Sequence, residues 1–440
     1  MRPMIRPLPH SRAVLSALLL AILLLSGCST SALNRARSQF YSGDTTGALA
    51  TLEDSSVVSS QDRLLYWLEK GLILHEEGNY EASVRELLNA SDYLAANDII
   101  SISDQARTLL ANDWAAKYPG ESSERLWLHS YLMMNFLTLG KYDSAAVEAR
   151  QALEQIATNR SVLAKDTFTR ALIALSFEAA GQLNDAYIEY RKLGDQTGHP
   201  PSIDQILLAQ AKRLGFTSDA ATISQRLRDA GIAEDTNPLE YARDAVFFVA
   251  SGRIPRKTSG TLLINRNSRI AFPAYHIAPS QSPRLQTTVN GAPCDCLQVS
   301  SDLGHLVRDS LKKRAALITA KTVVRATAKE SVTDAIADKD QFAGELARLI
   351  FFILEEADTR SWQSLPRHLS LLRVPLPAND KTITLSLQAG GVASQAYDID
   401  LNQALLKPLH AASNAIATSI GEPAVPATDN RRFRFYQLRL

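Results

Sequence analysis

The spacing of apolar residues divides the chain into two parts with different periodicities. From about residue 35 to 235, apolar residues recur every three or four positions, which predicts a series of amphipathic helices. The pattern changes near Asp235 to Pro238, where an Asn-Pro step within a polar cluster is typical of a boundary. We therefore expect a helical domain over 35–235 and a second domain over 240–440.

The second part mixes short apolar runs with two longer helical patterns. The predicted strands cover 245–250, 261–264, 269–272, 285–289, 371–374, 382–387 and 433–438. Asn290-Gly291 predicts a hairpin turn, and the Pro-rich stretch 375–380 predicts that its two flanking strands form another hairpin. Helices are expected over 302–337 and 341–356. The resulting fold is α+β, with a small, mostly antiparallel sheet packed by two long helices.

The apolar run 346–354 could suggest a membrane segment. It is only nine residues long and contains Arg348, whereas a helix that spans a bilayer needs about 20 apolar residues. We therefore interpret 341–356 as a buried core helix.

The first part contains an internal repeat centred on glycines. The repeat is marked by turn glycines at intervals of 35, 62, 41 and 34 residues, namely Gly43, Gly78, Gly140, Gly181 and Gly215. Each of them is followed by a small residue, and some copies also contain an aromatic residue. Glycine at a turn between helices tolerates positive φ. These segments resemble the tetratricopeptide (TPR) repeat, a 34-residue helix pair. The resemblance implies a TPR-like solenoid, with a degenerate repeat around 95–120; the alternative is an irregular helical bundle.

A solenoid has a concave face, formed by the first helix of each pair. In the strongest copies these positions hold Leu65, Leu68, Leu72, His75, Trp127, Ser130 and Met134. Such an apolar set would suit either a groove for a peptide partner or a tight superhelix filled by the chain itself. We favour the second interpretation.

The N-terminus has the pattern of an export signal. Three Arg residues precede an apolar run from Ala13 to Leu25, which is too short to cross a bilayer. The segment Leu25-Ser-Gly-Cys28 resembles the lipobox of bacterial lipoproteins. That resemblance implies a signal peptide over 1–27, a diacylglycerol thioether at Cys28 and a lipidated tether over 28–34. Ser29, where these lipoproteins use Asp for inner-membrane retention, favours the periplasmic face of the outer membrane.

Charge excludes one class of partner. Loss of residues 1–27 removes three of the 47 basic residues and none of the 46 acidic ones, so the mature chain is nearly neutral. We expect no binding to nucleic acid. The two remaining cysteines, Cys294 and Cys296, form a Cys-x-Cys pair that could be redox-active, bind metal or act only locally. We expect neither a cofactor nor a metal, apart from the covalent lipid.

A wider resemblance extends over nearly the whole chain. Segments 118–125, 140–150 and 357–366 are similar to a group of uncharacterised Gram-negative lipoproteins with a lipobox, TPR-like helices and a terminal α+β part. No activity is established for that group. Its members are thought to be encoded near lipoproteins that resemble activators of peptidoglycan synthases, which hints at cell-wall synthesis.

Within these segments, Asp358, Arg360 and Trp362 are candidate partner-binding residues, together with Trp127. A functional interpretation makes Asp358 and Arg360 a pair that faces a ligand, with Trp362 as a stacking surface. The structural interpretation is a polar knot that orients the following strand. The sequence contains none of the HExxH, GxSxG, P-loop or GxGxxG motifs, so no catalytic residue is assigned.

Three functions are consistent with these observations. The first is a non-catalytic scaffold or adaptor that is anchored at the outer membrane and binds an envelope protein. The second is an enzyme that acts on envelope or peptidoglycan material through residues 240–440. The third is a structural subunit of an export or surface-assembly complex. We expect the first, and therefore no enzymatic activity.

Overall fold

The computed structural model describes residues 29–98, 116–232, 243–263, 269–277, 286–293, 296–354, 356–376, 382–388, 395–400, 406–408 and 433–440. The predicted signal peptide, Cys28 and Cys294 lie outside these ranges, as does most of the proposed degenerate repeat at 95–120.

The first part folds into successive helix pairs. The pairs are α2 (Ser29–Tyr41) with α3 (Thr45–Thr51), α4 (Arg63–Glu76) with α5 (Tyr80–Asp98), α7 (Ser122–Thr138) with α8 (Tyr142–Thr158), α10 (Thr167–Ala179) with α11 (Leu183–Thr197), and α12 (Pro201–Leu214) with α13 (Thr217–Asp229). Short helices η1 (Ser55–Val57), η2 (Ser60–Asp62) and α9 (Arg160–Leu163) connect them. All five predicted turn glycines lie between the two helices of a pair, with φ from 70° to 90°.

Residues 29–34, predicted as part of a tether, belong to helix α2. The reason is burial, because Leu33, Ala36 and Phe40 recur on one face and pack into the core.

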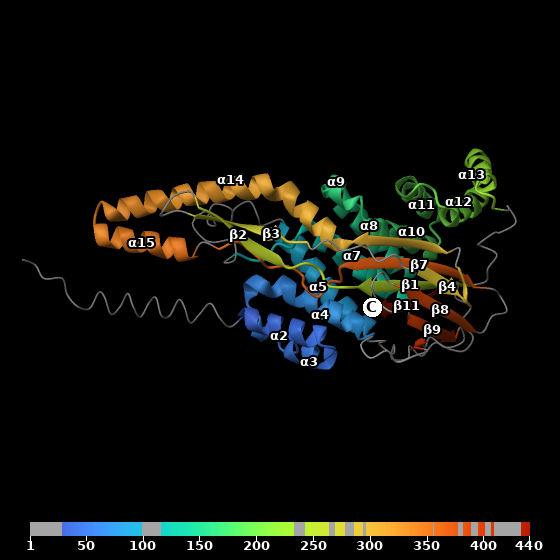
Figure 1. The fold of residues 1–440 in the computed structure, drawn as a ribbon, viewed down its shortest axis with the longest axis horizontal. Coiled ribbons are helices and arrows are strands. Elements are labelled where there is room, and N and C mark those ends of the chain that lie inside the picture. The colour runs from blue at the N-terminus through green and yellow to red at the C-terminus, as the bar shows by residue number, and fades with distance from the viewer. Residues whose placement is uncertain are drawn as a thin grey trace, which may run out of the picture.

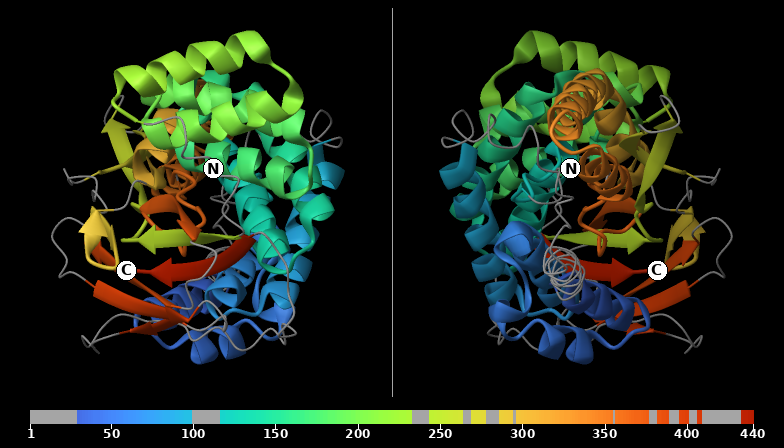
Figure 2. Two further views of the ribbon diagram at one scale, coloured as in Figure 1. Left: turned by 90° about the vertical axis from the view of Figure 1, so that its right-hand side faces the viewer. Right: turned by 90° about the vertical axis from the view of Figure 1, so that its left-hand side faces the viewer.

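The inner sheet packs in the hollow of the solenoid. Figure 2 shows the helices as an arc, from α2 and α3 in blue at the bottom to α12 and α13 in green at the top, with the strands inside it. The inner sheet has the order β11-β1-β7-β6, from strands β1 (Arg243–Ser251), β6 (Leu297–Asp302), β7 (His368–Leu376) and β11 (Phe433–Arg439). Only the pairing of β1 with β11 is parallel within it.

Two further sheets complete the strands that the structure describes. An antiparallel sheet of order β10-β9-β8-β4-β5 contains β4 (Gln286–Val289), β5 (Ala292–Pro293), β8 (Thr382–Gln388), β9 (Gln395–Asp400) and β10 (Leu406–Pro408). Strands β2 (Lys257–Leu263) and β3 (Arg269–Tyr275) form a two-stranded ribbon. The mainly helical repeat region followed by an α+β part with mostly antiparallel sheets confirms the predicted fold class.

One predicted hairpin is confirmed and the other is wrong. Asn290 and Gly291, both with positive φ, connect β4 to β5. In contrast, β7 and β8 belong to different sheets, and β7 pairs with β1 and β6. Leu369, Leu371 and Leu372 show why: apolar residues on both faces of β7 are buried, which requires a central position. That requirement outweighs the local Pro-rich turn signal.

The two long helices form an arm rather than a cover for the sheet. Figure 1 shows α14 (Leu303–Ala337) extending away from the body, with α15 (Gln341–Leu354) folded back beside it. The predicted buried core helix is therefore wrong for α15: Phe342 is 68% exposed and Leu349 is 54% exposed.

Candidate functional site

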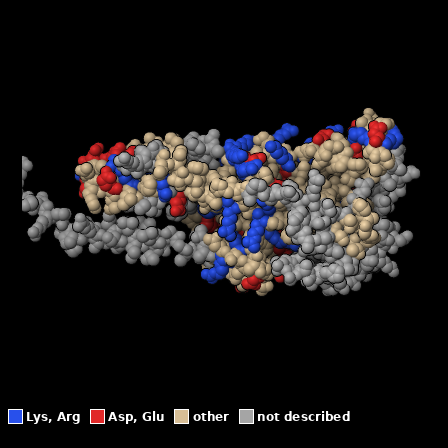
Figure 3. Space-filling view, in the orientation of Figure 1, with Lys and Arg blue, Asp and Glu red and all other residues tan. Residues whose placement is uncertain are grey.

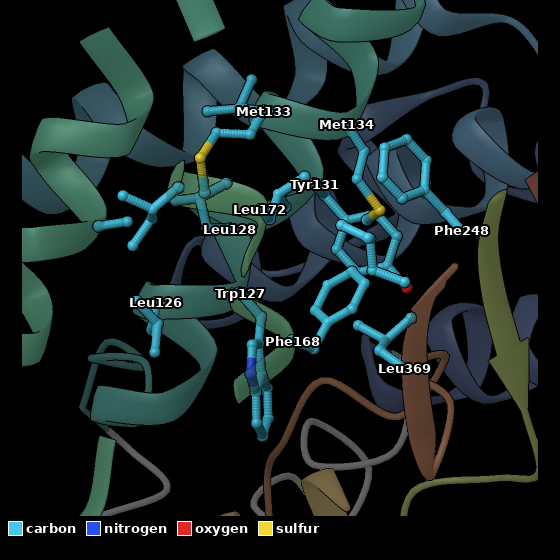
Figure 4. Packing of buried hydrophobic residues seen from close by; sticks show 14 of the residues in the cluster. Leu126, Trp127, Leu128, Tyr131, Met133, Met134, Phe168, Leu172, Phe248 and Leu369 are labelled. Atoms are coloured by element: carbon cyan, nitrogen blue, oxygen red, sulfur yellow. The ribbon is translucent and has the colours of Figure 1, made fainter. Parts of the chain in front are cut away.

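The concave face of the repeats is filled by the second part of the chain. All seven apolar or polar residues predicted to line it are buried. Figure 4 shows Tyr131, Met134 and Phe168 from the helices packed toward Phe248 and Leu369 from the strands. The interpretation that the chain fills its own groove is confirmed, and one hydrophobic core extends over both parts.

Segment 356–366, which follows the arm, lies against the first helices of two pairs without regular secondary structure. Glu69 on α4 accepts hydrogen bonds from the backbone N–H groups of Gln363 (2.9 Å) and Ser364 (3.1 Å). Glu124 on α7 accepts one from the N–H of Trp362 at 2.7 Å. The surface that a TPR-like groove would offer to a peptide is thus occupied by an internal peptide.

Two carboxylates at the start of α7, Glu121 and Glu124, have pKa values shifted in opposite directions. Burial raises the pKa of the Glu124 carboxyl above its ordinary value. Burial also acts to raise the pKa of Glu121, but Lys257, whose Nζ lies 2.6 Å from Glu121 Oε1, and Arg314 outweigh it, so that pKa is lowered. Glu121 therefore stays ionised and links α7 to β2 and α14.

The polar residues predicted as a site form the knot of the structural interpretation. Arg360 Nη2 lies 2.8 Å from Asp358 Oδ2, and its Nη1 lies 3.1 Å from Asp62 Oδ1. It also donates to the carbonyl of Ala116 at 3.0 Å and packs over the ring of Tyr118. These contacts hold the entry of segment 356–366 to the repeats.

Neither tryptophan has a surface for a partner. Trp127 is 0% exposed, and its Nε1 donates to Asp166 Oδ2 at 2.9 Å. Trp362 is 1% exposed, and its Nε1 donates to Ser364 Oγ at 3.0 Å. A buried ring cannot stack on a ligand, so Trp127 and Trp362 are corrected to core residues. Asp358, Arg360 and Trp362 lie along one segment, whereas Trp127 is on α7 and donates to Asp166.

The knot gives a testable expectation. Asp358→Asn leaves Arg360 with one of its two carboxylates, and we expect a loss of about 1–3 kcal/mol in the free energy of unfolding. Denaturant titration followed by circular dichroism measures it. A stable, folded variant that had lost only a biological phenotype would contradict the structural interpretation.

The arm is the feature that sequence reasoning missed. Nine large apolar side chains among the described residues are 36% exposed or more, and seven of these lie on α14, α15, β2 or β3. They are Leu262, Leu263, Phe272, Val323, Val324, Phe342 and Leu349. Large apolar patches on a protein surface are typical of contact sites, whereas single exposed apolar residues are usual on any surface. The sequence of 341–354 shows a helical periodicity. It does not show whether another element of the chain would cover the apolar face of that helix.

The described part of the chain offers no candidate metal site. It contains no cluster of three or more His, Cys, Asp or Glu side chains arranged to hold a metal ion. None of its helices combines the length and apolar character needed to cross a bilayer. Cys296 is in a disulfide.

Comparison with known proteins adds little. No family model matches the chain, and no curated protein matches it. Among solved structures, MamA from Desulfovibrio magneticus RS-1 is 13% identical, covers 47% of this chain and 94% of its own, and gives a TM-score of 0.32. MamA AMB-1 is 12% identical, with coverages of 46% and 93% and a TM-score of 0.32.

A third solved structure is the Rap conjugation gene regulator of plasmid pLS20 in complex with the Phr* peptide. It is 13% identical, covers 44% of this chain and 52% of its own, and has a TM-score of 0.26. Likenesses at this level carry no argument about activity or partners, so the helix pairs themselves establish the repeat architecture.

Proposed function

We propose that this protein is a non-catalytic scaffold, anchored by lipid at Cys28 to the periplasmic face of the outer membrane, that binds an envelope protein through its arm. The lipobox-like segment supports the proposed location at the membrane, and the helix-pair architecture supports a role in protein interaction. The resemblance to lipoproteins encoded near candidate synthase activators favours a partner in cell-wall synthesis.

The observation that carries the proposal is the exposed apolar surface of α15 and its neighbours. Because the concave face is already filled, an external peptide cannot use it without displacing segment 356–366. Phe342 and Leu349 instead lie on the arm, which extends from the body (Figure 1). A few buried aromatic and aliphatic anchors supply most of the affinity of a protein interface.

The partner side can be described by its chemistry. The arm combines its apolar residues with exposed charges of both signs, as the mixed red and blue at its end in Figure 3 shows. Asp334 and Glu345 flank Arg348 there, within ion pairs. We expect an apolar groove on the partner, with a polar rim that carries both signs of charge.

The test is co-purification of the cross-linked protein from solubilised envelope membranes. Phe342→Ser with Leu349→Ser should lower recovery of the partner about tenfold or more, because each truncation removes an anchor worth about 1–3 kcal/mol. The body should remain folded, since both side chains are mostly exposed.

Val147→Ser provides the matched control. Val147 is 52% exposed but lies on α8, away from the arm, so partner recovery should stay at the level of the unmodified protein. If the arm variant and this control recovered equal amounts of the partner, the assignment of the arm as the contact surface would be wrong.

A further inference from the structure

A hollow of about 680 Å³ lies where α2, the approach to β2 and segment 356–366 meet. Figure 3 shows Lys and Arg gathered at the middle of the face, in the region of α2, α4 and β2. Arg37, Arg253, Arg256 and Lys257 line the hollow, and none of its lining residues among the described ones is acidic. Its size is within the range of small-molecule sites.

Two of the four cations are already neutralised. Arg37 pairs with Glu69 at 2.6 Å, and Lys257 pairs with Glu121 at 2.6 Å. Arg253 and Arg256 are exposed, and no carboxylate pairs with either among the residues that the structure describes. The hollow therefore carries about two positive charges that are not compensated locally.

One of these guanidinium groups is held in place before any ligand arrives. Arg253 lies 4.0 Å from the centroid of the Tyr41 ring and donates from Nη2 to the Tyr41 carbonyl at 3.0 Å. The Tyr41 hydroxyl in turn donates to the carbonyl of Gln363 at 2.6 Å, which fixes the ring. A guanidinium fixed on an aromatic ring loses less entropy when it binds an anion.

Neutral donors complete the lining. The side-chain oxygen of Asn34 accepts from Arg37 Nη1 at 3.2 Å, which leaves its amide N–H groups available to a ligand. Ser38 and Thr359 add hydroxyl groups at the rim. The lining supplies several donors, and none of its residues that the structure describes is His, Asp or Glu, so we treat the hollow as a binding site.

We propose that this hollow binds a phosphate ester of headgroup size, with Arg253 and Arg256 as its charged contacts. Guanidinium groups match phosphate oxygens in bidentate geometry, and the space exceeds what a lone anion needs. The phosphate is carried either by a membrane phospholipid or by a soluble ester. The lipid source rests on the proposed function, because α2, which contributes Asn34 and Ser38, begins immediately after the proposed anchor.

Calorimetric titration of the full mature chain in a nonionic detergent tests the proposal. The probes are glycerol phosphate and short-chain phosphatidylglycerol, with glycerol as the neutral control. Arg256→Ser should weaken binding of the preferred probe about tenfold, and the double variant with Arg253→Ser should abolish it, because charge-assisted contacts are lost. Among the described residues, Arg256 makes no hydrogen bond or ion pair, so replacing it should leave the fold intact.

Arg85→Ser is the matched control, since Arg85 is an exposed arginine on α5 outside the hollow. If the unmodified chain binds both probes, a soluble phosphate ester is sufficient for binding. If it binds phosphatidylglycerol alone, the ligand is the membrane lipid. The proposal would be overturned if neither probe bound, or if Arg85→Ser and the double variant bound the preferred probe with equal affinity. Partner recovery through the arm should survive Arg256→Ser, so the two proposals fail separately.

Discussion

Glu178→Gln is expected to lower the free energy of unfolding by about 3 kcal/mol or more. Glu178 is fully buried on α10, and its carboxylate lies 2.7 Å from Nη1 of Arg373 on β7. Arg373 also pairs with Asp244 on β1 at 2.7 Å, so one counter-charge remains in the variant. Removal of one partner from a buried ion pair typically costs about 3–5 kcal/mol, because the other charge stays in the interior.

This pair also links the two parts of the fold. The Tyr190 hydroxyl donates to Glu178 at 2.9 Å, which adds α11 to the same network. Because the repeats and the inner sheet share one core, we expect a single unfolding transition in the unmodified protein. Denaturant titration in detergent, followed by circular dichroism and tryptophan fluorescence, measures both the midpoint and the coincidence of the two signals.

Glu154→Gln is the control, since Glu154 is an exposed glutamate on α8 and its replacement should change stability by no more than about 0.5 kcal/mol. A double-mutant cycle with Arg373→Met should show strong coupling to Glu178→Gln. If Glu178→Gln cost less than about 1 kcal/mol, the ion pair could not be the link between the halves that its burial indicates.

The repeat architecture could be predicted because its signals are local. A turn glycine such as Gly78 or Gly140 needs positive φ for its own backbone, and its flanking small residues reflect the packing of adjacent helices. The strands of the second part were found for the same reason, since burial of β1 is apparent from its own apolar run. The partners of each strand were harder to predict from the sequence, because β7 pairs with β1, more than a hundred residues away, and with β6 on its other side.

The candidate site was harder to predict because its residues meet over long separations. Glu178 and Arg373 are 195 positions apart, and Glu69 and Gln363 are 294 apart. A single glutamate on a helix is ordinarily solvated, so nothing local distinguishes Glu69 or Glu178 from an exposed residue. Trp127 was misassigned for a related reason: its position on the inner face was correctly expected, but the neighbour that covers it comes from another part of the chain.

Replacement of Cys28 by Ser is expected to abolish lipid attachment and change processing. The lipobox-like segment implies that diacylglycerol joins the thiol before cleavage, so a hydroxyl at this position should block both steps. Cells grown with labelled palmitate should then yield an unlabelled protein that migrates as the longer precursor. Each buried CH₂ contributes about 0.8 kcal/mol, and loss of several acyl chains should remove the mature form from the washed outer-membrane fraction.

Cys296→Ser is the control for this experiment, because Cys296 is engaged in a disulfide and should not carry lipid. Palmitate label and mobility should match the unmodified protein. A consequence for function follows, because α2, which directly follows Cys28 in sequence, packs into the core of the body, so lipid at Cys28 would keep the body close to the membrane. That confinement raises the effective concentration of the arm for a partner in the same membrane. Unchanged size, label and membrane yield in Cys28→Ser would remove the basis for this local-concentration mechanism.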